Sequence, residues 1–127
     1  MVARRQRRRG IADRALHRIE RVAYVDDVVD AFLRAGASEA SNGQVLNLGG
    51  GPPISLLDLA KDLVKLSGRS EIKVVPFPEE RKKIDIGDFY SDARKIESVL
   101  GWKSTTSFAE GLARTVDYYQ RHKDRYL

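Results

Sequence analysis

The chain has 127 residues, which suits one small domain, and it carries 23 Lys and Arg side chains against 18 Asp and Glu. It contains no cysteine, which excludes a disulfide scaffold, a cysteine zinc site and a cysteine nucleophile. No apolar run approaches the roughly 20 residues that span a bilayer. The arginine-rich start lacks the apolar stretch of a secretory signal. We therefore expect a soluble, cytoplasmic protein with no membrane contact.

The positive charge is concentrated at the N-terminus. Residues 1–21 hold eight arginines against Asp13 and Glu20, a net charge of +6, whereas the other 106 residues carry 15 basic and 16 acidic side chains. Apolar residues are sparse in this tail, which predicts poor order, although a helix over 11–19 is possible. We expect a tail at 1–21 followed by a folded lobe at 22–127.

Four helices are predicted in the lobe, over 25–36, 55–68, 92–101 and 107–119. Each of these ranges has a residue near its start that can cap a helix, and three of them end at a glycine. The second and fourth begin with capping-box patterns, a serine followed three residues later by an acidic residue. The first has an apolar face with helical spacing, formed by Val25, Val28, Val29, Phe32 and Leu33.

Two short strands alternate with these helices. Gln44–Leu48 is an apolar run that enters three glycines, and we expect it to be a buried strand. Ile72–Val75 is the second strand, and the polar stretch Phe77–Ser91 after it has no helical or strand period. Strands separated by helices pair in parallel. The predicted fold class is thus α/β, a small lobe with a two-stranded parallel sheet and about four helices.

The glycine run Gly49–Gly51 is the first candidate for chemistry. A glycine-rich turn between a strand and a helix can hold a phosphate on its backbone N–H groups. The dinucleotide fingerprint G-x-G-x-x-G is absent, however, and Pro52 and Pro53 have no N–H to donate. A nucleotide-contacting loop therefore stays open, and a plain strand-to-helix turn is the favoured interpretation.

Metal and hydrolytic chemistry have little support. The two histidines, His17 and His122, lie near the ends of the chain and do not form an H-x-x-x-H pair. No serine has an evident histidine and carboxylate partner, so we expect neither a metal site nor a triad. Asp26 and Asp27 look like a carboxylate pair, but side chains of adjacent residues diverge at a helix start, and capping is the favoured explanation.

The charged segment 79–88, with the sequence EERKKIDIGD, is more informative. A long loop without its own structure inside a compact domain is often functional. Its three consecutive cations at 81–83 could clamp a diphosphate, with arginine as the bidentate partner. A solvated charged loop is the alternative interpretation.

Seven short motifs in one order resemble the C-terminal part of the extended short-chain dehydrogenase/reductases, the NAD-dependent epimerases and dehydratases of nucleotide sugars. The resemblance covers about 22–127. An intact relative of this kind is an isomerase or dehydratase, for example one like UDP-glucose 4-epimerase. The motifs are YVDDVV at 24–29, NLGGG at 47–51, Arg81 with DIGD at 85–88, SDARKI at 91–96, LGW at 100–102, FAEGL at 108–112 and TVDYY at 115–119.

The resemblance implies that this region is the substrate lobe, which holds the nucleoside diphosphate of a sugar such as a UDP-sugar. One family arginine, in the loop before the SDARKI-type helix, corresponds to Arg81, with Lys82 as an alternative. The other falls on Glu20, so Arg21, one residue later, is its candidate. Val45 and Phe89 would line the same pocket, although packing in the core explains Val45 equally well. The substrate-binding candidates are Arg81, Lys82, Arg21, Val45 and Phe89.

The resemblance also implies what these 127 residues lack. In the family a preceding Rossmann lobe holds NAD and a catalytic Tyr-x-x-x-Lys pair. Here Tyr119 and Lys123 have that spacing, but they lie at the end of the last helix, and we interpret the match as chance. We therefore expect no catalytic residue, no bound cofactor and no activity in this chain alone. Residues 1–21 do not resemble the family, which suggests a fragment from a truncated or frameshifted reading frame whose partner is the missing Rossmann lobe.

Two other hypotheses belong to different classes. The arginines between Arg4 and Arg9 could give a basic arm that binds nucleic acid or an acidic partner by counterion release, although no aromatic residues are interleaved with them. Nucleic acid is accordingly not the expected partner. A third hypothesis is a lobe with no ligand, whose apolar face favours self-association.

Overall fold

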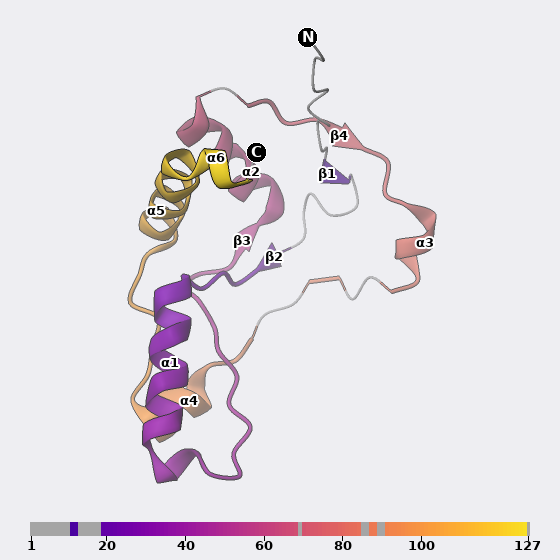
Figure 1. The fold of residues 1–127 in the computed structure, drawn as a ribbon. Helices are drawn as coiled ribbons and strands as arrows, with labels where there is room; N and C mark the ends of the chain where they lie inside the picture. The colour runs from indigo at the N-terminus through magenta and orange to yellow at the C-terminus, as the bar shows by residue number, and fades with distance from the viewer. Residues whose placement is uncertain (1–10, 13–18, 69, 85–86, 89–90, 127) are drawn as a thin grey trace.

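The structure, a computed structural model, describes residues 11–12, 19–68, 70–84, 87–88 and 91–126. The lobe is elongated, with α1 and α4 at one end and α2, α5 and α6 at the other (Figure 1). A third part, β4 and α3, extends to one side. The elements in chain order are β1 (Ile11–Ala12), β2 (Ile19–Glu20), α1 (Val25–Ala37), η2 (Glu39–Ser41), β3 (Ile54–Ser55), α2 (Leu56–Ser67), β4 (Val74–Val75), α3 (Glu79–Lys82), α4 (Arg94–Leu100), α5 (Phe108–Arg121) and α6 (Lys123–Tyr126).

The four predicted helices are confirmed as α1, α2, α4 and α5, and their caps explain where two of them begin. The Ser55 hydroxyl oxygen accepts from the Asp58 backbone N–H at 3.0 Å, and the Ser107 hydroxyl oxygen accepts from that of Glu110 at 3.2 Å. Each bond satisfies a backbone N–H that a helix start leaves unpaired. The glycine that ends α2, Gly68, has a φ of 65°, the left-handed conformation that favours glycine.

The face of helix α1 that packs against the rest of the protein is not its apolar face. Asp27 and Ala31 are its buried residues. Val25, Val29, Phe32 and Leu33 are exposed.

The core lies between α1 and α4. It consists of Ala31, Ile96 and Trp102, each exposed by 2% or less. The partly buried side chains of Leu46 and Leu48 pack against it. The Trp102 indole N–H donates to the backbone carbonyl of Asp27 at 2.9 Å, so the largest core side chain is also hydrogen-bonded.

The strand predictions were right in part. Val74 and Val75 form β4, which pairs in parallel with β1, with Ile11 opposite Val74. This is a two-stranded parallel sheet, as the predicted fold class required. The predicted partner of β4 was wrong, because Gln44–Leu48 takes part in no ladder among the described residues.

The segment 44–48 is extended without strand pairing, and its Val45 is 77% exposed. Packing in the core therefore does not explain why residue 45 is a valine. A second ladder was not predicted. It is antiparallel and joins β2 to β3, with Ile19 opposite Ser55. The possible helix over 11–19 was wrong at both of its ends, where Ile11 and Ile19 are in strands, and residues 13–18 lie outside the described residues.

Two details of the loops and helix ends differ from expectation. The helix α4 begins at Arg94, and Asp92 accepts from the Arg94 backbone N–H at 3.0 Å just before it. The charged segment after Pro78 contains one short helix, α3. None of the described helices is both long and apolar enough to cross a membrane.

Candidate functional site

Asp27 is a buried carboxylate that ties α1 to the segment before α5. It is 7% exposed. Its two oxygens accept from the hydroxyls of Ser104, Thr105 and Thr106 at 2.8, 3.0 and 3.1 Å. They also accept from the backbone N–H groups of Thr105 and Thr106 at 3.2 and 2.9 Å. The side chain of Asp27 is therefore fully engaged with residues more than 75 positions away.

These bonds decide the charge of Asp27. Burial alone would raise the pKa of the carboxyl group. The backbone N–H of Thr106 and the three hydroxyls outweigh that effect and lower the pKa below its usual range. Asp27 is therefore ionised and unsuited to act as a proton donor. The expectation that Asp27 caps α1 was wrong, because α1 has no side-chain cap and the carboxylate contacts another segment.

An open, charged groove lies on the side of the molecule where the glycine turn meets α4. Arg94 holds Asp92 in a bidentate pair, with its Nε 3.0 and 2.9 Å from the two carboxylate oxygens. Lys103 Nζ lies 2.6 Å from a Glu97 oxygen. The groove is lined by Arg21, Gly50, Asp92, Arg94, Glu97 and Lys103, among others.

Most of the charged groups in this groove are paired with one another. The bond from the Arg94 side chain, helped by its backbone N–H and by the charge of Arg21, lowers the pKa of Asp92 to about 2. The contact with Glu97 raises the pKa of Lys103. Both acids are thus paired with their own cations. Arg21 is exposed and forms no ion pair with another described residue, and its charge acts on Asp92 across the groove.

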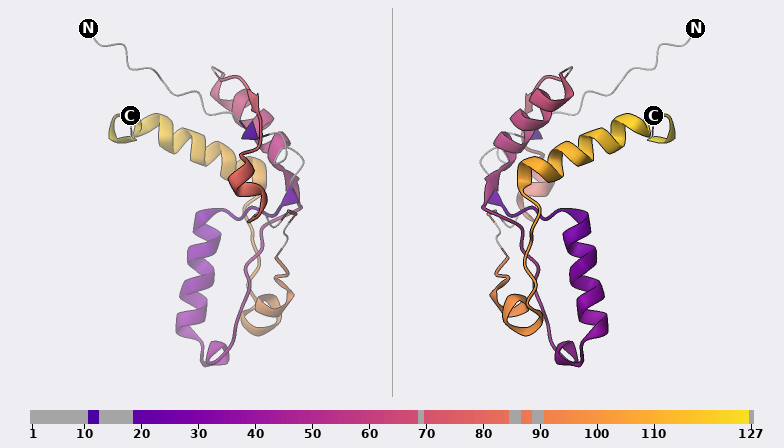
Figure 2. Two further views of the ribbon diagram at one scale, coloured as in Figure 1. Left: turned by 90° about the vertical axis from the view of Figure 1, so that its right-hand side faces the viewer. Right: turned by 90° about the vertical axis from the view of Figure 1, so that its left-hand side faces the viewer.

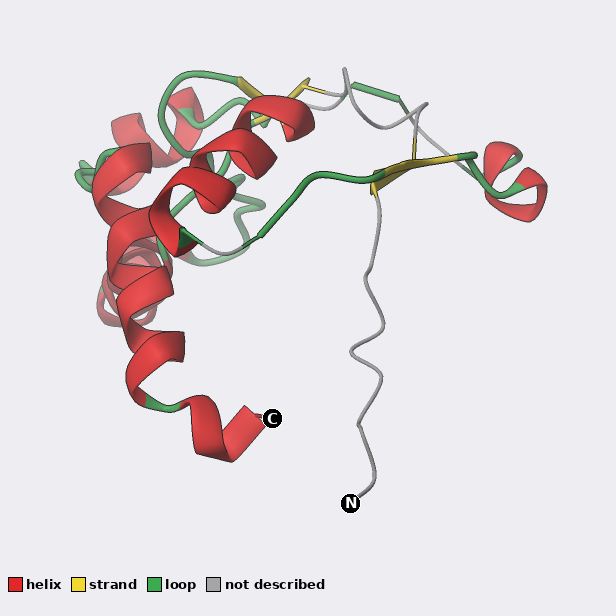
Figure 3. Cartoon of the chain, turned by 90° about the horizontal axis from the view of Figure 1, so that it is seen from above, coloured by secondary structure: helices red, strands yellow, loops and turns green. Residues whose placement is uncertain are grey.

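The predicted residues Arg81 and Lys82 lie elsewhere, on α3. Figures 1 and 3 both show α3 at the far end of the extension that carries β4. Lys82 forms an ion pair with Glu79. Arg81 is exposed and has no ion-pair partner among the described residues.

The structure does not bring all the predicted site residues together. Arg21 lies in the charged groove, Val45 lies exposed on the segment beside α1, and Arg81 and Lys82 share α3. Phe89 lies outside the described residues. Sequence reasoning missed Arg94 and Lys103 as groove residues. Arg94 is inside the SDARKI motif, but only the capping and the inward face of that motif were used.

A second hollow is apolar and was not predicted. It lies where the start of α1 meets α2 and α5. The guanidinium carbon of Arg114 lies 5.6 Å from the centre of the Tyr24 ring, a cation–π distance. Its walls include Tyr24, Val25, Leu59, Phe108, Leu112 and Tyr119. Such walls suit a ring or an alkyl group rather than a charged one.

The described residues form no candidate metal site, and the glycine turn has a structural role. They contain no group of three or more potential metal-ligating side chains. The glycine turn is used for packing instead. A Cβ on Gly50 would lie 1.7 Å from the backbone oxygen of Val22, and one on Gly49 would lie 3.3 Å from the Cβ of Ala93. These two glycines therefore allow close approach of the turn to the neighbouring segments.

Known enzymes match most of this chain in sequence. It is 35% identical over 100 residues to UDP-glucose 4-epimerase from Mycolicibacterium smegmatis, a match that covers 76% of this chain and 30% of that protein. It is 32% identical over 104 residues to mouse dTDP-D-glucose 4,6-dehydratase, covering 78% and 28%. The chain is homologous to the C-terminal part of the nucleotide-sugar epimerases and dehydratases. It spans about 30% of the length of these curated relatives. No family model matches.

Solved structures share the fold of this C-terminal epimerase part. The epimerase Mth375 from Methanothermobacter thermautotrophicus superposes with a TM-score of 0.78 at 20% identity, covering 92% of this chain and 34% of that one. UDP-glucose 4-epimerase from Bifidobacterium longum, solved with NAD+ and UDP, gives 0.72 at 24% identity, covering 85% and 32%. The expected fold class and family resemblance are thus confirmed.

Proposed function

We propose that this chain is a nucleotide-sugar-binding lobe that holds the diphosphate of a nucleoside diphosphate sugar such as a UDP-sugar. The observation that carries the proposal is the 35% identity to UDP-glucose 4-epimerase across 76% of the chain. The charged groove supports it, because a diphosphate needs unpaired cationic forks and Arg21 supplies one there.

The remaining binding candidates belong to the same proposal. Arg81, with Lys82 beside it, would provide a second cation on α3, and Arg81 is exposed. Val45 is exposed on its segment, where an apolar side chain can contact a ligand. Phe89 follows from the family resemblance alone. In this proposal the lobe anchors and orients a sugar nucleotide, which is the contribution of positioning to catalysis.

We also propose that the chain alone does not interconvert sugars. Its one Tyr-x-x-x-Lys match joins Tyr119, on α5, to Lys123, on α6. These two residues belong to different helices, and Tyr119 is 52% exposed. The glycine turn is occupied by its own packing against Val22. In this proposal the groups that hold NAD and transfer hydride do not come from the described residues.

Isothermal titration with UDP tests the binding proposal. We expect Arg21→Ala and Arg81→Ala each to weaken binding about tenfold, because each removes a charge-assisted contact to phosphate. Lys61→Ala is the matched control, since Lys61 is an exposed cation paired with Asp58 on α2 and should leave the affinity unchanged. Equal affinity in the parent, Arg21→Ala and Arg81→Ala would refute the assignment of both arginines.

The nucleic-acid alternative gains nothing from these comparisons. The two curated relatives described above are sugar-nucleotide enzymes by name. The arginines at 4–9 that motivated the alternative lie outside the described residues. It stays a prediction from the charge of the tail alone.

A further inference from the structure

The chain reverses beyond the end of α1 through a tight turn that holds one of its two asparagines. Figure 2 shows this reversal at the lower end of the molecule in both of its views. The turn runs from Ser41 to Gln44, and the Gln44 backbone N–H donates to the Ser41 carbonyl at 3.0 Å. Asn42 has a φ of −60° and a ψ of 128°, and Gly43 has a φ of 67°. These angles match a type II turn, whose third position favours glycine.

Asn42 and Gly43 are both open to solvent. Each is exposed, and a Cβ built on Gly43 meets nothing within 4 Å. The backbone N–H groups on either side of Gly43 are engaged, that of Asn42 with the Glu39 carbonyl at 3.0 Å and that of Gln44 within the turn. The Gly43 N–H between them donates to no other described residue. The peptide nitrogen that follows the asparagine is therefore unobstructed.

We propose that Asn42 is a site of spontaneous covalent modification, in which its side-chain amide is converted into an isoaspartyl linkage. The Gly43 nitrogen attacks Cγ of Asn42. An N–Cγ bond forms, the Cγ–Nδ2 bond breaks, and ammonia leaves with the proton of the attacking nitrogen, so the product is a five-membered succinimide ring. Water then opens the ring, at Cγ to give aspartate or at the backbone carbonyl to give isoaspartate.

The glycine at position 43 makes this attack possible. At a ψ of 128° the Gly43 nitrogen is turned away from Cγ of Asn42, so the peptide must rotate about the Cα–C bond before the ring can close. Glycine permits the rotation because it has no side chain and adopts a wide range of backbone conformations.

The second asparagine of the chain, Asn47, provides an internal comparison. It is also exposed, but it precedes Leu48, whose side chain packs against the core. The peptide after Asn47 is therefore hindered by a side chain and anchored by packing. The two asparagines share their access to solvent and differ in the residue that follows.

The modification disturbs the packing that follows the turn. An isoaspartyl residue lengthens the main chain by one carbon and adds a negative charge. The turn leads directly into the segment 44–48, whose Leu46 and Leu48 pack against the core. A longer turn displaces the start of that segment, and close-packed interiors tolerate such displacements poorly. The turn contributes no residue to the charged groove, so this inference does not rest on nucleotide binding.

Peptide mapping by mass spectrometry tests the modification on the full chain, incubated for several weeks at body temperature and mildly alkaline pH. Trypsin cleaves after Arg34 and Lys61, so both asparagines fall in one peptide, 35–61. This peptide should gain about 1 Da, because a hydroxyl or its oxygen replaces the amide nitrogen. Fragmentation should place the change at least about tenfold more often on Asn42 than on Asn47. No conversion of Asn42, or equal conversion of both, would overturn the proposal.

Matched variants test the effect on packing. The incubated parent should melt several degrees below the fresh parent. Asn42→Gln keeps an exposed amide but requires a six-membered ring, so it should stay unmodified and keep its melting temperature through the same incubation. Fresh Asn42→Asp carries the charge without the extra carbon and should melt with the fresh parent. An equal loss in Asn42→Asp, or unchanged melting of a converted parent, would overturn the role of the longer main chain.

Discussion

At the scale of single residues, Asp27 contributes more to the fold than its place at a helix start suggested. Replacing it by alanine leaves two backbone N–H groups and three hydroxyls of residues 104–106 without their acceptor. We expect Asp27→Ala to lower the free energy of unfolding by about 3 kcal/mol. Urea unfolding measures this. Asp26→Ala, one residue earlier and exposed, should change it by less than about 0.5 kcal/mol; equal losses would contradict the assigned role.

The same carboxylate predicts how stability depends on pH. Its pKa is lowered in the folded state, so the unfolded chain binds the proton more readily. The stabilisation from Asp27 is complete above the ordinary aspartate pKa near 3.9 and is lost as the pH falls through the folded value. Unfolding of the parent and of Asp27→Asn, compared from pH 7 to pH 3, should show the difference between them shrinking with acid. A constant difference would exclude this linkage.

At the scale of elements, the crossing of two chain segments depends on one glycine. The backbone at Gly50 passes so close to Val22 that an added Cβ would lie 1.7 Å from a backbone oxygen, and a backbone atom cannot rotate away. We expect Gly50→Ala to cost more than about 3 kcal/mol or to prevent folding. Gly51→Ala is the matched control, since nothing lies within 4 Å of its Cβ. Thermal melts of both variants give the comparison, and equal melting temperatures would contradict this packing.

The elements also show what sequence patterns can predict. The helices followed from local signals, such as the serine caps at Ser55 and Ser107, whose bonds span only three residues. The pairing of strands did not, because β1 and β4 are joined by contacts between residues 63 positions apart. Apolar character at 44–48 indicated a buried strand, yet Val45 is exposed. An apolar run indicates that its side chains favour nonpolar contacts, but it does not show which part of the protein provides them.

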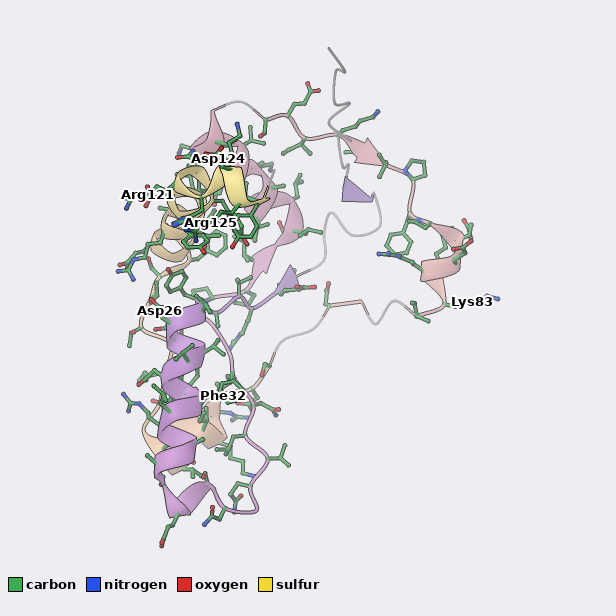
Figure 4. The ribbon with its side chains drawn as sticks, in the orientation of Figure 1. Asp26, Phe32, Lys83, Arg121, Asp124 and Arg125 are labelled. Atoms are coloured by element: carbon green, nitrogen blue, oxygen red, sulfur yellow. The ribbon has the colours of Figure 1, made fainter. Side chains whose placement is uncertain are left out.

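At the scale of the whole molecule, the candidate site was harder to predict than the fold. The family motifs pointed to Arg21 and Arg81, but only three-dimensional proximity shows that Arg94 and Lys103 line the groove beside Arg21. Arg81 lies on α3, at the end of the extension shown in Figure 3. Figure 4 marks that place by Lys83, the residue after α3. A motif assigns residue types to positions along the chain, and it does not say which distant positions share a surface.

The distribution of charge over the whole chain gives the last prediction. Five arginines lie between Arg4 and Arg9, whereas residues 22–127 are nearly neutral. Up to five phosphates can therefore be neutralised by the tail. We expect arbitrary duplex DNA to be bound weakly, with a slope of log affinity against log salt of about −4. Deleting residues 1–9 should remove this binding in a fluorescence anisotropy titration and leave UDP affinity unchanged. DNA binding that survives the deletion would place the nucleic-acid surface on the lobe itself.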